Sequence, residues 1–413
     1  MAAAEQATGS VETRTSWLVA AAAVAILSVS FGAPVIVVVA LPTIAADLGE
    51  ARAVPALASS LAYLGAGAGG VLMGWLAGRV GTRPVAVAGG AMVCAGLALA
   101  AGGAAWQLLL GYGLLVGLLG NGALFPPLMT YVSLWFDRRR GAALALVCSG
   151  QYVAGALWPA LFERAVAALG WQRTMLGFGL LAAAVIVPLA ALVLRPPPPV
   201  PAPGAGPAAA GPRAGAPVLR LPPDLALALL ALASFLCCVP MAMPAAHLVA
   251  FCGDLGIAAS RGALMLSLLL AAAFVARQFW GWTADRIGGL RTLLAGSVAQ
   301  TLGMAGFLLT QDEAGLFFVA AAYGLGFSGL VPAYVLTVRE LFPAREAAWR
   351  VPGLLFLSLC GMAAGAWLAG FLFDRFGNYA VAWEAGIACN LVNLAVLGPL
   401  ARRQGTRPRP APA

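Results

Sequence analysis

The sequence contains no lysine and only one histidine among its 413 residues, and charged residues make up just 9% of it. A soluble globular protein carries about 25% charged residues, because its surface must be hydrated. With 62% hydrophobic residues, the chain has too few charges to cover a soluble fold of this length. The composition therefore excludes an ordinary soluble domain and indicates a protein whose solvent is a lipid bilayer.

Sequence patterns typical of enzymes and metal sites are also missing. The chain has no HExxH and no GxSxG motif, and its seven cysteines have no metal-ligand spacing. We interpret the cysteines as small packing residues, since six lie within apolar runs. We accordingly expect no catalytic residue, no metal, no cofactor and no nucleic-acid partner, which makes an intramembrane enzyme a distant alternative.

Long apolar runs dominate what is present. A helix needs about 20 apolar residues to cross a bilayer, so the spacing of charges, Gly and Pro predicts twelve spanning helices. The first apolar run is too long for the core of a cleavable signal peptide, so we expect it to be retained. The predicted spans are 17–43, 55–78, 84–104, 106–130, 141–162, 174–194, 225–251, 262–284, 292–311, 315–337, 352–373 and 380–400.

The arginines predict the orientation of these spans. If the N-terminus is cytoplasmic, the outer segments hold only Arg52, Arg164, Arg173, Arg261 and Arg375. Arg277 falls inside a span, and the other 18 of the 24 arginines lie in cytoplasmic segments. Because basic residues favour the cytoplasmic side, the distribution predicts that both termini are cytoplasmic. The predicted location is the plasma (inner) membrane.

The chain divides into two similar halves. Residues 196–223 are rich in Pro, Gly and Ala without helical periodicity, and predict a cytoplasmic linker. Six-helix bundles are predicted for 1–195 and 224–413. The motif GWLAGRVGTR at 74–83 follows the second span, and GWTADRIGGLR at 281–291 follows the eighth. The pattern predicts an all-α membrane protein of two pseudo-symmetric bundles, as in transporters with their substrate site between repeats.

These two motifs resemble the signature of the major facilitator superfamily, which lies between spans two and three and recurs between spans eight and nine. The resemblance implies a charged latch that holds the outward-open state. The first copy has Gly78 where an Asp is usual, so we expect the second copy to matter more. The gating residues that the resemblance implies are Gly74, Arg79, Arg83, Asp137, Arg138, Gly281, Asp285, Arg286 and Arg291.

A finer resemblance concerns the fifth and eighth spans. The segment WFDRRRGAALA at 135–145, followed by Ser149-Gly-Gln151, resembles the fifth-helix motif of the monocarboxylate transporter family. The segment Val275-Ala-Arg277 resembles the helix in which that family and the oxalate/formate antiporters carry a substrate-binding Arg. The resemblance implies a small organic acid as substrate and protons as the coupling ion. Ala273 and Phe125 depart from residues common in the family, which leaves the substrate and the proton route open.

Arg277 is also unusual independently of the family resemblance, because it is a charged residue within an apolar span. An Arg within a span costs on the order of 2.5–3.5 kcal/mol on insertion scales, so it should face the bundle interior or a cavity, or snorkel to the cytoplasmic side. No acidic residue lies at its depth in any span; Glu384 is near the outer end of the last one. A lone guanidinium suits a monoanion, because its fork donates two parallel hydrogen bonds to a carboxylate.

His247 is the one histidine, in a span interrupted by Pro240 and Pro244. Broken helices line cavities in transporters, and a histidine with an ordinary pKa of about 6.5 suits proton exchange. We therefore predict His247 as the proton-coupling residue, with an interfacial packing role as the alternative.

Other polar side chains at membrane depth are expected mostly to bond neighbouring helices. From these and the aromatic residues we predict Tyr334, Phe327 and Phe125 as further substrate contacts. The polar residues in question are Tyr63, Asn121, Tyr131, Gln151, Tyr152, Gln300, Tyr323, Tyr334 and Asn393.

The sequence as a whole predicts a monomeric secondary active transporter of small organic anions, proton-linked and working by alternating access. A porter for a drug or sugar is the alternative, although it would leave Arg277 without a role. A membrane receptor is a more distant one, because no large soluble domain is present.

Overall fold

A computed structural model of the chain describes residues 12–136, 139–196 and 218–405. Within these ranges the chain is helical, and Val218 and Leu221 form an isolated β-bridge without any strand. The predicted linker at 196–223 thus lies mostly outside the described residues. Within the helices, the side chains not described are those of residues 140–142, 145, 285, 344, 345, 347–349 and 405.

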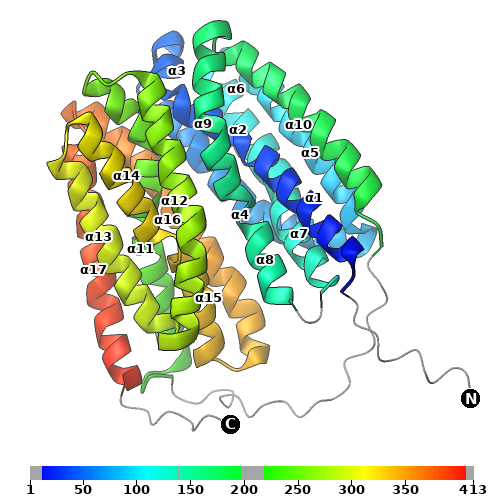
Figure 1. Ribbon diagram of the computed structural model, residues 1–413, viewed down its shortest axis with the longest axis vertical. Helices are drawn as coiled ribbons and strands as arrows, with labels where there is room; N and C mark the ends of the chain where they lie inside the picture. Colours follow the sequence, from blue (N-terminus) through cyan, green and yellow to red (C-terminus); the bar gives the residue numbers. More distant parts are fainter. Residues whose placement is uncertain (1–11, 137–138, 197–217, 406–413) are drawn as a thin grey trace, which may run out of the picture.

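The N-terminal half consists of ten α-helices and one π-helical segment, labelled as in Figure 1. They are α1 (Arg14–Ser30), α2 (Gly32–Val39), α3 (Leu41–Leu48), α4 (Ala53–Val80), α5 (Thr82–Ala100), α6 (Ala105–Leu110), η1 (Gly111–Asn121), α7 (Gly122–Ser133), α8 (Arg140–Cys148), α9 (Gly150–Leu169) and α10 (Trp171–Val193).

The described part of the C-terminal half consists of seven helices, three of which continue through prolines at interior positions. They are α11 (Pro223–Asp254), α12 (Ala259–Ile287), α13 (Gly289–Leu309), α14 (Glu313–Phe327), α15 (Leu330–Leu341), α16 (Ala344–Phe376) and α17 (Ala380–Gly405).

Eleven helical stretches among the described residues are long and apolar enough to cross a membrane. The predicted fifth span, 141–162, is the one outside this group. It falls on α8 and α9, which are separated at Ser149, and α9 carries Gln151, Glu163 and Arg164, which lower its hydropathy. The all-helical membrane fold is thereby confirmed, whereas the count of twelve stays a prediction.

The first helix begins and the last helix ends at the same end of the molecule (Figure 1). We call this the proximal end, and the opposite end, where α3 leads into α4 and α16 into α17, the distal end. An odd number of crossings would place Arg14 and Gln404 at opposite ends. The arrangement is what an even number of spans requires.

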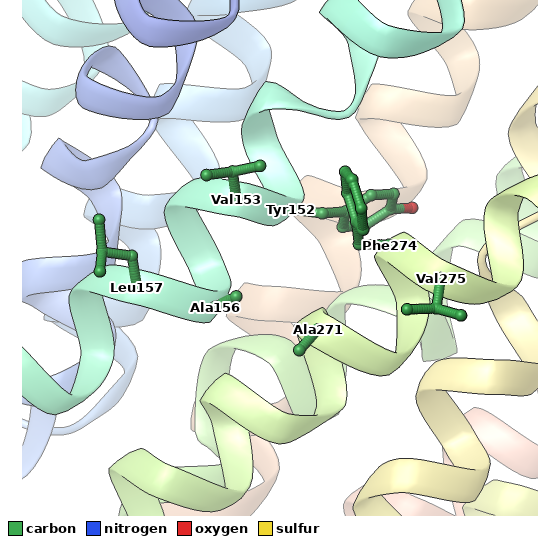
Figure 2. Close-up of a pocket in the computed structure, with 7 residues that line it drawn as sticks. All are labelled: Tyr152, Val153, Ala156, Leu157, Ala271, Phe274 and Val275. Atoms are coloured by element: carbon green, nitrogen blue, oxygen red, sulfur yellow. The ribbon is translucent and has the colours of Figure 1, made fainter.

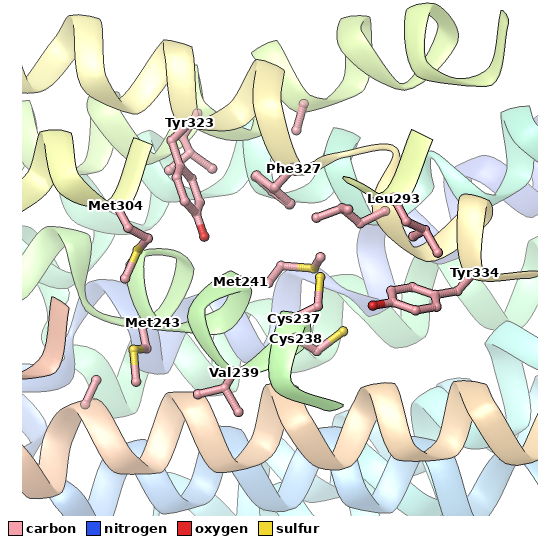
Figure 3. Packing of buried hydrophobic residues seen from close by; sticks show 14 of the residues in the cluster. Cys237, Cys238, Val239, Met241, Met243, Leu293, Met304, Tyr323, Phe327 and Tyr334 are labelled. Atoms are coloured by element: carbon pink, nitrogen blue, oxygen red, sulfur yellow. The ribbon is translucent and has the colours of Figure 1, made fainter. Parts of the chain in front are cut away.

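Two hydrophobic cores fill the molecule. One is built from residues between Val19 and Leu194, and the other mainly from residues between Val218 and Leu400. Figure 3 shows part of the second core, where Tyr323, Phe327 and Tyr334 lie around the sulfur-containing side chains of α11.

Four helices make the main contacts between the halves. The α4 helix packs on α16 and α9 packs on α12. Small residues allow this approach: a Cβ on Gly155 would lie 2.1 Å from Leu270. The Ser60 hydroxyl donates to the Ala363 carbonyl at 2.7 Å, which ties α4 to α16. The α9–α12 contact brings the predicted substrate residue Arg277 against the N-terminal half.

Candidate substrate site

Arg277 lies in the proximal half of α12. At 1.5 Å per residue, it is about 27 Å along the helix from Ala259, which is at the distal end. Its residue is 9% exposed, so it faces neighbouring helices and not the surroundings of the bundle. Arg277 therefore faces the interior of the bundle in the structure, as predicted.

The guanidinium of Arg277 is held by the N-terminal half. Its Nη2 donates to the Tyr152 hydroxyl and its Nη1 to the Cys148 carbonyl, each at 3.3 Å. The carbonyl is available because α8 ends at Cys148, and the last carbonyls of a helix have no partner within it. The guanidinium carbon also lies 4.5 Å from the centre of the Tyr152 ring, a cation–π contact.

Arg277 has no carboxylate within ion-pair distance among the described residues. Its Nε is buried without a hydrogen-bond partner there. Arg350, a second buried arginine, differs: it pairs with Glu346 at 2.9 Å and Asp224 at 3.2 Å. Among the described residues, one buried guanidinium is thus neutralised by carboxylates and the other has neutral partners only.

An open cavity of about 380 Å³ adjoins this arginine site between α9 and α12 (Figure 2), and its lining residues Leu157 and Val275 are exposed. Tyr152 lines the cavity and also contacts Arg277, so it lies between the two. The cavity lining is otherwise apolar. It consists of Tyr152, Val153, Ala156 and Leu157 from α9 with Ala271, Phe274 and Val275 from α12.

Of the predicted aromatic contacts, only Phe327 joins this site. Its ring lies edge-on to Tyr152, with 6.5 Å between ring centres. Tyr334 instead donates to Asn393 at 3.1 Å inside the C-terminal core. Phe125 packs against Phe31, 5.7 Å between ring centres, within the N-terminal half. No contact in the described structure joins Tyr334 or Phe125 to Arg277, although all four residues stay untested as substrate contacts.

Several polar residues predicted to bond neighbouring helices do so. Tyr323 donates to the Pro240 carbonyl at 2.7 Å, and Gln300 to the Cys237 carbonyl at 3.2 Å. Tyr131 donates to the Arg195 carbonyl. Tyr152 was in the same group of expected structural residues, and its position against Arg277 was not predicted from the sequence.

The predicted gating motifs lie at the proximal end, and three of their glycines face open space. A Cβ on Gly74, Gly78 or Gly281 would meet nothing within 4 Å. In each copy the Arg lies over a Trp one turn earlier, Arg79 over Trp75 at 4.0 Å and Arg286 over Trp282 at 3.7 Å.

Five further gating residues complete this set. Arg83 and Arg291 are exposed. Asp137 and Arg138 lie outside the described residues, as does the side chain of Asp285. Their latch role stays a prediction.

His247 lies away from Arg277, near the distal end. It is seven residues from the end of α11, about 10 Å along the helix, so roughly 15 Å of depth separates the two. Its Nε2 lies 2.8 Å from the Ala366 carbonyl and its Nδ1 lies 3.0 Å from the Tyr379 hydroxyl. It is fully buried. Glu384, the other polar candidate in this region, is exposed.

Arg52, in the α3–α4 connection, extends this distal cluster. Burial by itself would lower the pKa of Arg52, but hydrogen bonds to Asp254 and Tyr379 and their charges raise it above its ordinary value. Burial raises the pKa of Tyr379 as well. Arg52 therefore stays a cation and Tyr379 stays a neutral phenol over the physiological range.

Comparison with known proteins agrees with this geometry. The sequence profile of the Major Facilitator Superfamily matches residues 18–348 and 230–413. The chain belongs to the Major Facilitator Superfamily. It is therefore a multi-pass membrane transporter and not an enzyme, which confirms the predicted fold class and family.

Individual relatives of this superfamily member are distant. Human monocarboxylate transporter 11 is 27% identical over 377 residues, covering 89% of this chain and 79% of that protein. The Aspergillus flavus MFS transporter asaE is 25% identical over 279 residues, which is 66% of this chain and 60% of the fungal protein. A bacterial homologue of the human lysosomal transporter Spinster, inward-facing and occupied, has the same fold. Its TM-score is 0.71 at 16% identity, covering 97% of this chain and 100% of that chain.

Proposed function

We propose that this superfamily member is a secondary active transporter of small organic monoanions, in particular monocarboxylates, and that Arg277 binds the carboxylate. The observation that carries the proposal is a buried guanidinium with neutral partners only, next to an apolar cavity. A desolvated cation of this kind is stabilised by an anion, and its unpartnered Nε supplies a further donor. The similarity to a human monocarboxylate transporter supports the same substrate class.

The single cation favours one negative charge on the substrate. A dicarboxylate would bring a second charge into a cavity whose lining is apolar apart from Tyr152. Burying that second charge without a partner costs several kcal/mol. The apolar lining suits the hydrocarbon part of a monocarboxylate instead.

The transport cycle that we propose is alternating access between two bundles, 1–195 and 224–413, joined by the linker 196–223. The two separate cores support this division. Contacts of Arg52 with α11 and α16 join the two halves at the distal end, whereas Gly74, Gly78 and Gly281 of the proximal motifs face open space. We propose twelve spans in the plasma membrane, with the proximal end cytoplasmic, in keeping with the arginine distribution. Protons as coupling ion, with His247 as carrier, stay a prediction.

Binding to purified variants tests the substrate assignment. The probes are labelled acetate, pyruvate and benzoate, with succinate as the dianion and glucose as a neutral probe. Arg277→Gln should weaken monocarboxylate binding by about ten- to a hundredfold, since hydrogen bonds to charged groups contribute about 1.5–3 kcal/mol. Arg277→Lys keeps the charge and loses the fork, so it should retain part of the affinity.

Arg350→Gln is the matched control, because Arg350 is buried but already paired. It should lower the thermal stability by leaving Glu346 and Asp224 unpaired, while the folded fraction binds with parental affinity. Parental affinity in Arg277→Gln would refute the site. Binding of glucose in preference to the acids would favour the sugar or drug porter instead.

A further inference from the structure

A cluster of charged and aromatic side chains joins the two halves at the distal end. Arg52, from the N-terminal half, donates with both Nη atoms to the Asp254 carboxylate at the end of α11, at 2.5 and 2.6 Å. The backbone N–H groups of Arg52 and Ala53 donate to Asp374, near the end of α16, at 3.0 and 2.7 Å. The C-terminal half thereby binds both the side chain of Arg52 and the beginning of α4.

Aromatic rings enclose the Arg52 guanidinium. Its central carbon lies 3.9 Å from the centre of the Phe373 ring, and Nη1 donates to the Tyr379 hydroxyl at 3.3 Å. The side chain of Arg52 is only 17% exposed. A bidentate, partly desolvated ion pair of this kind is stronger than an exposed one. Opening the distal end requires that these contacts break.

The hydrogen bonds around His247 fix its tautomer. The Ala366 carbonyl only accepts, so Nε2 of His247 must carry the proton that it donates. In neutral His247, Nδ1 then accepts from the Tyr379 hydroxyl, whose oxygen accepts from Arg52. In the closed cluster, hydrogen bonds thus run in one direction, from the Arg52 donor through Tyr379 to the Nδ1 acceptor of a neutral His247.

Protonation of His247 conflicts with this series of hydrogen bonds. An added proton on Nδ1 turns it into a donor toward Tyr379, whose hydrogen must then leave the line between the two residues. The imidazolium and the guanidinium would also be separated by one phenol oxygen. Among the described residues, the charged and titratable groups that face His247 are Arg52 and Tyr379; Asp254 and Asp374 bind the other sides of Arg52.

We propose that the Arg52 cluster is an acid-sensitive latch, closed while His247 is neutral and released when His247 is protonated. The proton comes from the solvent at the distal end and returns there when the latch closes, since the closed state holds the neutral tautomer. By linkage, the state that binds the proton more tightly is the distal-open one, so acid shifts the population toward it. The inference rests on the proposed alternating-access cycle but not on the identity of the substrate.

Distances between spin labels on the full-length protein test the latch without substrate. One label replaces exposed Arg173, at the distal start of α10, and the other replaces exposed Gln311, in the distal α13–α14 connection. Both are introduced after the seven native cysteines have been replaced. Lowering the pH from about 8 to about 5, the range in which histidine titrates, should increase the longer-distance population of the parent.

Two variants test which residues cause the change of these distances with pH. His247→Gln can still donate to the Ala366 carbonyl but takes up no proton, so its distance distribution should not respond to acid. Arg52→Gln should give the longer distances at both pH values, because the ion pair is lost. Thermal unfolding of each variant verifies that it is folded.

Two results would overturn the latch. The first is a parent whose distances do not change with pH. The second is a folded His247→Gln protein with the parental acid response, which would assign that response to the carboxylates. Neither outcome depends on whether Arg277 binds an organic acid.

Discussion

At the residue scale, Arg277 and Arg350 have the same chemistry in opposite surroundings. Arg350 is 4% exposed and binds two carboxylates, whereas Arg277 is 9% exposed and binds a carbonyl and a phenol. Burial alone therefore does not mark a binding site in this chain. The lack of a carboxylate partner among the described residues distinguishes Arg277 and supports its proposed role, because removing water from a cation must be offset by some partner.

Tyr152 is the residue that the structure adds to the site. Tyr152→Phe keeps the ring over Arg277 but removes the hydroxyl that accepts from Nη2. We expect monocarboxylate affinity to fall about three- to tenfold, and further in Tyr152→Ala, which also loses the cation–π contact. Titration calorimetry with benzoate measures both.

Tyr112→Phe is the control for this prediction. Its hydroxyl donates to the Ala33 carbonyl at 2.9 Å inside the N-terminal half, away from Arg277. We expect lower stability without a change in affinity. Equal losses of affinity in Tyr112→Phe and Tyr152→Phe would show that the effect of Tyr152 is structural.

At the scale of elements, the break between α8 and α9 positions the site. A continuous helix would bond the Cys148 carbonyl internally, whereas the break at Ser149 leaves it for Arg277. The predicted fifth span contains this break and is not among the eleven stretches that are long and apolar enough to cross a membrane. The sequence Ser149-Gly-Gln151 is the visible sign of this break, since Ser and Gly are weak helix formers.

Close packing of α11 on α16 depends on two glycines one turn apart. A Cβ on Gly361 would lie 2.3 Å from the Phe235 carbonyl, and one on Gly365 would lie 2.0 Å from the Val239 carbonyl. The GxxxG spacing in this helix thus serves helix packing.

Substitution of Gly365 tests this packing. Gly365→Ala should destabilise the protein by about 1–3 kcal/mol, because backbone cannot move aside as a side chain can. The midpoint of thermal unfolding in detergent measures the change. Gly353→Ala on the same helix is the control, since a Cβ there meets nothing within 4 Å and Ala favours helix. Similar midpoints for the two variants would contradict the packing argument.

At the scale of the whole molecule, the arginine distribution and the position of the helix ends make one prediction about orientation. Gln311→Cys lies at the distal end and Arg402→Cys at the proximal end, and both positions are exposed. In intact cells, an impermeant maleimide should label Gln311→Cys and leave Arg402→Cys unlabelled until the membrane is permeabilised. The reverse pattern would invert the proposed topology.

The membrane environment, the helical fold and the repeated halves followed from the sequence alone. These depend on composition and on the spacing of apolar residues, charges and turn residues, which are local properties of the chain. The need of Arg277 for a partner was equally visible, because a charge in a span is unfavourable whatever surrounds it. Family resemblance added the superfamily, which the profile match confirms.

The tertiary structure decided which side chains meet. Tyr152 and Arg277 are 125 residues apart in sequence, and Arg52 and Asp374 are 322 apart. Hydrophobic periodicity is weak in helices that face lipid on one side and other apolar helices on the other, so it does not define their contacting faces. Tyr334 and Tyr152 are both tyrosines at membrane depth, and only the packing of α9 on α12 places Tyr152, and not Tyr334, on the guanidinium.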